Sequence, residues 1–326
     1  MGIREFLKKN KTIRKIGKKI NIDSQFRQDA RDFNAFFEES AREKGDFRYS
    51  IMLLVHSLEK GMCFPDPRPF GFDKVKELMK LLHAYPEEKR EEFEYKLGVS
   101  ALNAWESFFA SRGWTDDPVF AEAAGFLKEH PADPEIAAGW KEYRPAGSAA
   151  DETAFAELLS SRCSVRDFQD RKIERKDMEF ALRCFTETPT ACNRQMCRVL
   201  YVEDPEKKEL LNSVLIGIPG FNRKTVQFFV ISYDLAAFAY SGERQQGLFN
   251  AGLCAMNFIN GLHVKGIGSC CLQWSNKGVQ DRKVRSALGL AESERIGVVI
   301  AAGYYLESNT VPCSVRRSPE DIFRTV

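Results

Sequence analysis

Residues 161–168 read Ser161-Arg-Cys-Ser-Val-Arg-Asp-Phe168 and follow the segment Phe155–Ser161, which we expect to be a helix. Arg162 and Arg166 stand four positions apart with Ser164 between them. Two guanidinium groups and a hydroxyl at this spacing can donate charge-assisted hydrogen bonds to a phosphate. Taken alone, the segment favours a solvated charge cluster at the end of a helix, so its meaning depends on the rest of the chain.

A second polar segment, Thr188-Pro-Thr-Ala-Cys-Asn-Arg-Gln195, lies between an expected helix and an expected strand. Asn193 and Gln195 each carry a hydrogen-bond donor and an acceptor, which suits recognition of the imide edge of a heterocycle. Taken alone, this segment favours an ordinary turn before a strand.

A third segment is rich in glycine and reads Gly266-Ile-Gly-Ser-Cys270. Glycines let backbone N–H groups approach a ligand closely. The segment fits neither the G-x-G-x-x-G pattern nor the P-loop pattern, so Rossmann-type nucleotide binding is not supported. A fourth segment, Gly303-Tyr-Tyr305, ends an expected strand, and Arg316-Arg-Ser-Pro319 follows near the C-terminus.

The four segments belong to a half of the chain in which strands and helices alternate. Short runs rich in Val, Ile, Phe and Tyr predict strands at Val199–Val202, Gln227–Tyr233, Ser269–Trp274 and Ile296–Tyr305. Further helices are expected at Arg175–Thr186, Gln246–Val264 and Val279–Leu288. The helix Gln246–Val264 carries more apolar residues than one amphipathic face requires. It should be buried on all sides, either centrally or against a second subunit.

The first half of the chain is predicted to be almost entirely helical. Apolar residues recur at three- and four-residue steps in Ile51–Leu58, Lys74–Leu82 and Phe93–Phe109. Three prolines forbid helix in the loop Cys63–Gly71. Small and turn-forming residues fill Arg144–Asp151, which we interpret as a linker. We therefore divide the chain into a helical N-terminal region, residues 1–150, and a second domain, residues 151–326.

Composition limits the class of protein. The 326 residues are 44% hydrophobic and 29% charged, which excludes disordered, collagen-like and disulfide-scaffold chains. No apolar run approaches the ~20 residues that a bilayer span needs. The nine cysteines form no C-x-x-C pair and no grouping at zinc spacing, so we expect reduced, mostly buried thiols in the cytoplasm and no metal site. The group His56, Glu59 and Lys60 is a poor metal site because a cation accompanies only two ligands.

The net charge of +2 is unevenly distributed, because residues 1–20 carry +7 and the other 306 residues −5. The body is unlike a nucleic-acid-binding protein, and residues 1–20 lack the apolar core of a secretory signal. Six apolar residues recur there at helical spacing among the basic ones: Ile3, Phe6, Leu7, Ile13, Ile16 and Ile20. Such a basic amphipathic helix either makes peripheral contact with the inner face of an anionic membrane or packs onto the protein's own helical half.

Together and in this order, the four segments resemble the nitroreductase family of FMN-dependent oxidoreductases over residues 155–323. The pattern R-x-S-x-R-x-F is met by Arg162 to Phe168, and P-[ST]-x-x-N-x-Q by Pro189 to Gln195. G-[IL]-G-S/T follows the long apolar helix, and G-Y…R-x-P is completed by Arg317 and Pro319.

The resemblance implies an α+β fold with a central, mostly antiparallel sheet flanked by helices, here preceded by an all-α region. It also implies an intertwined homodimer with two FMN sites at the subunit interface. Carried across residue by residue, the cofactor-binding residues are Arg162, Cys163, Ser164, Arg166, Pro189, Thr190, Asn193, Gln195, Ile267, Gly268, Arg316 and Arg317.

The implied roles differ along the chain. Arg162 and Ser164 would hold the flavin phosphate, Arg317 would add a second cation there, and Arg166 would face the pyrimidine side of the ring. Ile267 and Gly268 would lie beside the ring. The loop 189–195 would come from the other subunit.

This chain departs from the family pattern at two places. Cys163 stands where Arg or His is common, and Met196-Cys197 stands where an aromatic residue usually follows the loop. These departures bear on the phosphate contact and on the substrate-side packing.

The implied activity is hydride transfer from NAD(P)H, through FMN, to an organic acceptor such as a nitro compound or a quinone, by a ping-pong mechanism. The flavin carries the chemistry, so no catalytic side chain and no metal is expected. The sequence does not distinguish NADH from NADPH as the hydride donor, and it does not identify the physiological acceptor.

The alternative is a flavin-binding regulatory or docking protein of an envelope or polysaccharide system, without NAD(P)H turnover. The two departures and the additional 150 residues motivate it. The segment His56–Gly61 also resembles an N-terminal extension on nitroreductase-like proteins linked with cell-surface polysaccharide genes.

Overall fold

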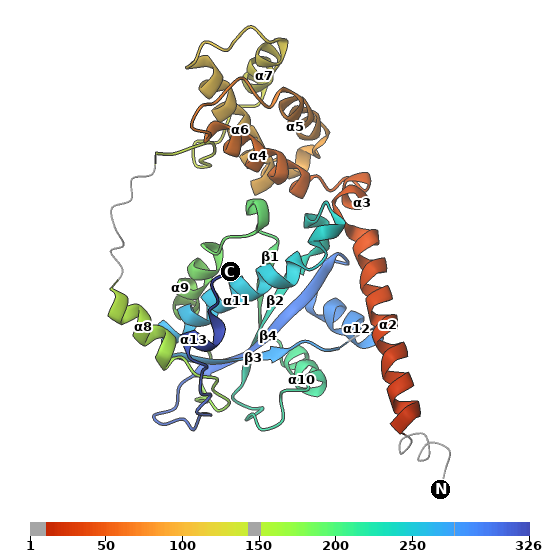
Figure 1. Cartoon of the computed structure of the whole chain (residues 1–326), viewed down its shortest axis with the longest axis vertical. Coiled ribbons are helices and arrows are strands. Elements are labelled where there is room, and N and C mark those ends of the chain that lie inside the picture. The colour runs from red at the N-terminus through yellow and green to blue at the C-terminus, as the bar shows by residue number, and fades with distance from the viewer. Residues whose placement is uncertain (1–10, 143–150, 277) are drawn as a thin grey trace.

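The computed structural model describes residues 11–142, 151–276 and 278–326 (Figure 1). Helices alone occupy the described residues up to 142, and helices surround a four-stranded sheet after residue 151. The strands are β1 (Cys197–Val202), β2 (Gln227–Asp234), β3 (Ile267–Gln273) and β4 (Glu294–Tyr304). They lie in the order β1-β2-β4-β3, and each neighbouring pair is antiparallel. The predicted α+β class with an antiparallel sheet is confirmed.

The remaining elements are helices. The α-helices are α2 (Lys11–Phe36), α3 (Glu38–Glu43), α4 (Arg48–Met62), α5 (Phe72–Ala84), α6 (Phe93–Ala110), α7 (Pro118–Glu129), α8 (Glu152–Ser161), α9 (Arg175–Thr186), α10 (Pro205–Val214), α11 (Gln246–Val264), α12 (Gly278–Leu288) and α13 (Pro319–Ile322). Single 3₁₀ turns are η1 (Glu87–Lys89), η2 (Ala191–Asn193), η3 (Leu235–Ala237) and η4 (Ser241–Glu243).

The sheet separates two layers of core because successive side chains of a strand point to opposite faces. On one face, Phe229 and Ile300 belong to the buried cluster that includes Phe258 of α11. On the other face, Phe228 and Val299 pack in a cluster with residues of α10 and α12. Both faces of the two central strands are therefore covered, which explains the continuous apolar runs Phe228–Ile231 of β2 and Val298–Ala302 of β4.

Helices α9 and α11 pack together closely on the first face. A Cβ atom at Gly261 of α11 would lie 2.6 Å from the Cα of Ala181 in α9. A side chain at position 261 would push the two helices apart, so glycine sets their spacing.

The helical region has its own aromatic centre. Trp105 of α6 is fully buried, stacks near Phe109, and donates its indole N–H to the carbonyl of Phe70 at 3.1 Å. This hydrogen bond fixes the end of the proline-rich loop, 63–71, against α6. The three helices expected from periodicity lie within α4, α5 and α6.

Helices α2 to α4 join the helical region to the sheet domain. Phe33 of α2 stacks with Phe238 at 6.4 Å, and the N–H of Glu38 donates to the carbonyl of Phe238 at 2.9 Å. Arg48 of α4 forms an ion pair with the buried Asp234 at 3.3 Å. The division at residue 150 stays a prediction, and the proposed linker, apart from Asp151, lies outside the described residues.

Three sequence expectations need correction. Central burial of α11 is wrong, because the helix covers one face of the sheet and Leu248 and Phe249 are 54% and 61% exposed. Burial against a second subunit, the other alternative, stays a prediction. Helix α10 was not predicted, although Asp204 caps its first turn and Pro205 occupies its first position. Only three of the nine free thiols are buried: Cys197, Cys254 and Cys270.

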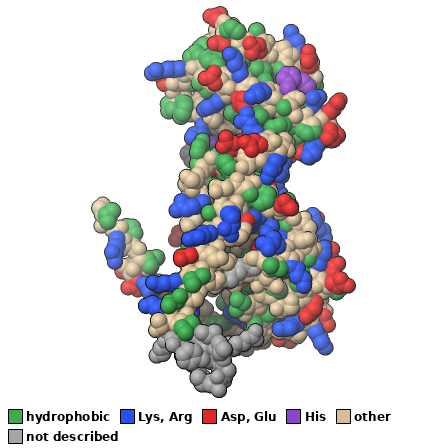
Figure 2. All heavy atoms as spheres, turned by 90° about the vertical axis from the view of Figure 1, so that its right-hand side faces the viewer, with side chains coloured by type: hydrophobic (Ala, Val, Ile, Leu, Met, Phe, Trp, Pro, Cys, Tyr) green, Lys and Arg blue, Asp and Glu red, His purple; other side chains and the backbone are tan. Residues whose placement is uncertain are grey.

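Charged side chains of both signs cover the face of the molecule on which α2 lies (Figure 2). None of the helices in the described part of the chain is both long and apolar enough to cross a membrane.

Candidate functional site

The first and third sequence motifs lie side by side. Arg162 ends α8, and the chain then runs extended beside the edge strand β3. Ser164 forms a parallel bridge with Ser269, and the N–H of Val165 donates to the carbonyl of Ser269 at 3.0 Å. This pairing brings the arginines of the first motif next to Ile267 and Gly268.

The fourth motif joins them through close backbone packing. The N–H of Gln169 donates to the carbonyl of Tyr304 at 3.0 Å. A Cβ atom at Gly303 would lie 2.5 Å from the Cβ of Phe168, and one at Gly268 would lie 2.9 Å from the ring of Tyr305. The two motif glycines are therefore required for the first motif to reach the sheet.

A chain of hydrogen bonds surrounds Arg162. The hydroxyl of Ser161 and Nε2 of His263 are 2.8 Å apart, and Nδ1 of His263 and the hydroxyl of Tyr305 are 2.7 Å apart. Burial lowers the pKa of His263, and the nearby Arg162 lowers it further. Burial also raises the pKa of Tyr305. A neutral imidazole held between two hydroxyls thus forms one wall beside the guanidinium.

The Nε atom of Arg162 is buried and has no hydrogen-bond partner. A buried donor without a partner costs free energy, more so when it is charged. An anion at this position would complete its hydrogen bonding. The residues around Arg162 therefore fit the phosphate group that the sequence predicted here.

The other cations predicted for the site are more exposed. Arg166 is exposed and donates to the carbonyl of Ser164 at 3.3 Å, and Cys163 between them is half-buried. Arg316 and Arg317 are exposed on the segment that leads to α13. Within the described residues, no hydrogen bond or ion pair joins either arginine to the first motif.

The second motif is a strained loop. Three residues other than glycine have left-handed backbone conformations: Cys192 (φ 52°), Asn193 (φ 51°) and Gln195 (φ 48°). Such conformations are uncommon for residues with a side chain, and they cluster at ligand-binding sites. The hydroxyl of Thr190 accepts from the N–H of Gln195 at 2.9 Å and so closes the loop. Asn193 and Pro189 are exposed at its surface.

Arg194 anchors this loop. The sequence analysis did not select this residue. Its side chain is fully buried and donates to the carbonyls of Ala191 and Ala237 and to the carboxylate of Glu243. Burial alone would raise the pKa of Glu243, but the hydrogen bond from Arg194 holds it below its ordinary value. The sequence did not indicate this burial, because Arg194 is a single arginine within a polar loop.

A pocket of about 330 Å³ opens beside the second motif. Thr190 and Gln195 line one side of it, and the thiols of Cys197 and Cys254 line another. The hydrogen bond between the two thiols lowers the pKa of Cys254.

The two groups of motifs stand apart within one chain. The second motif precedes β1 and the first motif pairs with β3, and these strands are the opposite edges of the sheet. Helix α11 contacts both, since Asn250 accepts from the N–H of Ala191 and His263 bonds to Ser161. Thirteen residues of helix separate Asn250 from His263, which corresponds to about 20 Å. One chain therefore does not bring all the predicted cofactor-binding residues into one pocket.

The segment His56–Gly61 lies on α4, which packs against η2 in the second motif. Burial lowers the pKa of His56, and Lys60 and Arg194 lower it further. The carboxylate of Glu59 accepts from the N–H of Gly139 at 3.2 Å, so it has a structural partner.

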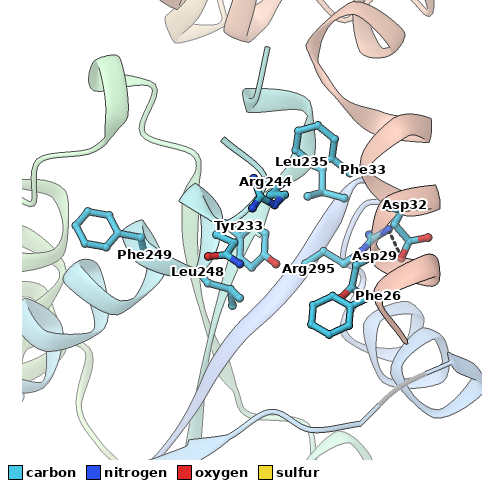
Figure 3. A pocket seen from close by; sticks show the side chains of 12 residues that line it. Phe26, Asp29, Asp32, Phe33, Tyr233, Leu235, Arg244, Leu248, Phe249 and Arg295 are labelled. Atoms are coloured by element: carbon cyan, nitrogen blue, oxygen red, sulfur yellow. Dashed lines mark ion pairs between the residues drawn. The ribbon is translucent and has the colours of Figure 1, made fainter. Parts of the chain in front are cut away.

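A cavity of about 650 Å³ lies away from these motifs, between α2 and the sheet domain (Figure 3). Phe26 of α2 and Leu248 and Phe249 of α11 are among its lining residues, and Asp32 pairs with Arg295 at 3.0 Å.

Comparison with known proteins gives a family match and a set of similar folds. The model described as the Nitroreductase family matches residues 159–304. No curated protein matches the chain.

Crystal structures with similar chains include three bacterial proteins. A Desulfovibrio desulfuricans protein described as a nitroreductase, in complex with FMN, is 19% identical with a TM-score of 0.44, over 54% of this chain and 98% of its own. An FMN-dependent nitroreductase from Clostridium difficile is 21% identical with a TM-score of 0.42, over 51% and 94%. A nitroreductase family protein from Streptococcus pneumoniae is 22% identical with a TM-score of 0.44, over 53% and 100%.

Proposed function

We propose, from the nitroreductase family domain that residues 159–304 of this chain form, that the protein is an FMN-dependent oxidoreductase. The family match confirms the resemblance predicted from the four motifs. The proposed activity passes electrons from NAD(P)H to a small organic acceptor of the nitro or quinone type, by a ping-pong mechanism.

The observation that carries the proposal is the buried, unpartnered Nε of Arg162. Arg162 and Ser164 would hold the phosphate of FMN, with Cys163 between them and Arg316 and Arg317 as added cations. When bound, FMN accepts a hydride from the nicotinamide and passes two electrons to the acceptor.

The protein's own residues would position and tune the ring. Arg166 would stabilise the negative charge that reduction places on the pyrimidine side. Ile267 and Gly268 would lie beside the ring, where the absence of a side chain at position 268 allows close approach.

The remaining predicted contacts require a second copy of the chain. Pro189, Thr190, Asn193 and Gln195 lie at the opposite edge of the sheet from Arg162, so they would reach the flavin from the partner of a homodimer. The exposed side of α11, with Leu248, Phe249 and Leu253, supports this assembly because it leaves a large apolar surface uncovered.

Nine free thiols, three of them exposed, support a reducing compartment, and we place the protein in the cytoplasm.

A visible spectrum tests the flavin proposal directly. The purified protein, supplied with FMN and then desalted, should retain the two absorption bands of an oxidised flavin. A protein that retains no flavin after this treatment would contradict the proposal.

The alternative, a flavin-binding docking or regulatory protein of an envelope or polysaccharide system, is favoured by one observation. Helix α4 of the N-terminal region packs directly on the strained loop that would face the flavin. Stopped-flow mixing of the FMN complex with NADH and with NADPH separates the two proposals. Rapid bleaching of the flavin band supports the oxidoreductase, whereas a stable oxidised flavin supports the docking protein.

A further inference from the structure

Helix α2 is attached to the rest of the molecule by one side of its second half. Phe33 stacks on Phe238, Asp32 pairs with Arg295 at 3.0 Å, and Phe26 faces the cavity beside α11. The helix has 26 residues and so extends about 39 Å. Its first half carries the basic and apolar residues that the sequence analysis singled out.

The side of α2 away from these attachments has a distinct composition. At 100° per residue, Ile13, Ile16, Ile20, Arg27 and Arg31 cluster roughly 130° around the helix from Phe26 and Phe33. We call these five residues the outward face. Asp23 lies at its margin.

The isoleucines of the outward face are accessible. Ile16 and Ile20 are 53% and 64% exposed, and Ile13 is 37% exposed. The sequence alternative in which this stripe packs onto the helical half is therefore wrong for Ile16 and Ile20. Ile3, Phe6 and Leu7 lie outside the described residues.

Positive charge accompanies the apolar residues. Arg27 and Arg31 on the outward face are exposed. Lys15, Lys18 and Lys19 are exposed too, but Lys15 and Lys19 project on the side of Phe26 and Phe33, and Lys18 lies opposite the outward face. Figure 2 shows Lys and Arg side chains gathered with hydrophobic ones on this part of the molecule. Residues 37–326, which follow α2, carry −4 in net charge. An anionic surface would therefore attract α2 and repel the body.

We propose that the outward face of α2 docks the protein on an anionic lipid bilayer. The isoleucines enter the boundary between headgroups and acyl chains, as in interfacial amphipathic helices. Arg27 and Arg31 contact the anionic headgroups, and their long apolar stems follow the helix to the surface. The face points away from the attached side of α2, so docking needs no rearrangement of the fold.

Charge complementarity favours a lipid surface over a second copy of this chain. An apolar patch made for a protein partner is usually depleted in charge at its centre. Here arginines continue the same stripe as the isoleucines.

The test is co-sedimentation of the full-length protein with vesicles of phosphatidylcholine alone and of phosphatidylcholine mixed with phosphatidylglycerol. We expect the protein to sediment with the anionic vesicles only, and added salt to release it. Each cation near such a surface contributes about fivefold in partitioning. Changing Arg27 and Arg31 together to Gln should lower the partition coefficient about 25-fold.

A second variant tests the apolar part of the contact. Ile16→Ser with Ile20→Ser should lower partitioning at least about tenfold, since both side chains leave water on docking. The matched control changes Lys76 and Lys128 to Gln, which removes the same charge from exposed positions of α5 and α7. This control should bind as the unchanged protein does.

Three results would overturn the proposal. They are equal sedimentation with both vesicle types, equal loss in the control variant, and a lower mass of the Ile16→Ser, Ile20→Ser variant in light scattering without vesicles. The last result would assign the face to a second copy of the chain. Retained FMN binding by every variant verifies that the fold is intact.

Discussion

At the scale of single residues, two arginines of the candidate site differ in how their hydrogen bonds are satisfied. Arg162 has a buried Nε without a partner, so it is available for a ligand. Arg194 is fully buried with its donors satisfied by two carbonyls and Glu243, so it holds the loop that bears the left-handed residues. The same residue type thus has an unsatisfied donor in one place, where we propose a binding role, and satisfied donors in the other, where it holds the loop.

Arg162→Ala should weaken FMN binding ten- to a hundredfold. A charge-assisted hydrogen bond to phosphate contributes about 1.5–3 kcal/mol, and the substitution removes at least one. Fluorescence titration of the flavin-free protein measures the affinity. Arg175→Ala on the exposed side of α9 is the control and should bind FMN as the unchanged protein does. An unaltered affinity in the Arg162 variant would remove this residue from the phosphate site.

Arg194→Ala should lower the free energy of unfolding by about 3–5 kcal/mol. Removing one partner of a buried pair leaves the other charge uncompensated, here the carboxylate of Glu243. Urea denaturation followed by circular dichroism measures the loss. Arg183→Ala, an exposed position on α9, should change the stability by less than about 0.5 kcal/mol. A similar small effect at position 194 would show that the loop is not anchored by this contact.

At the scale of elements, α11 connects the parts of the proposed site. One side of the helix covers the sheet, its first half bonds to the second motif, and its last turn bonds to the first motif. The opposite side exposes a row of large apolar residues: Leu248, Phe249, Leu253 and Met256. The sheet covers only one of the two apolar sides of α11. This predicts that a second molecule covers the other side.

Leu253→Asp should convert the proposed homodimer to a monomer. A carboxylate buried at the interface would lack a partner, and this cost opposes association. Light scattering at micromolar concentration measures the mass, and FMN affinity should fall at the same time because the loop 189–195 of the partner is lost. Ile216→Asp, which places the same charge on an exposed apolar residue after α10, should leave both unchanged. A monomeric mass for the unchanged protein with FMN bound would contradict the dimer.

At the scale of the whole molecule, three histidines make the free energy of unfolding depend on pH in the same direction. Burial is the first cause of a lowered pKa at His56, His130 and His263, and neighbouring cations add to it at each. They lie in the helical region and at the edge of the sheet domain. Their contributions to the pH dependence of the free energy of unfolding therefore add, and they come from both halves of the chain.

The free energy of unfolding should decrease as pH falls from about 7.5 to about 5.5. Below the ordinary histidine pKa of about 6.5 the unfolded chain binds protons that the folded chain does not, so protonation favours unfolding. Urea denaturation across this range measures the slope. Changing His56 and His263 to Gln should make the slope shallower. A stability that rises toward pH 5.5 would contradict the direction of these pKa shifts.

The amino-acid sequence by itself determined most of the elements of the sheet domain and the resemblance to the nitroreductase family. Short runs rich in Val, Ile, Phe and Tyr located all four strands, and apolar residues at three- and four-residue steps located α4, α5 and α6, because such patterns depend only on neighbours within a few residues. The motif arginines and glycines indicated a phosphate-bearing flavin, and Gly268 and Gly303 stand where a side chain would collide with Tyr305 and Phe168.

Only the tertiary structure decided how these parts combine. The strand order β1-β2-β4-β3 places the first and second motifs at opposite edges, and no local pattern encodes strand order. Likewise, the burial of Arg194, the uncovered side of α11 and the outward face of α2 depend on which distant segments pack against each residue. Those contacts join positions tens to hundreds of residues apart, so they become visible only when the chain is folded.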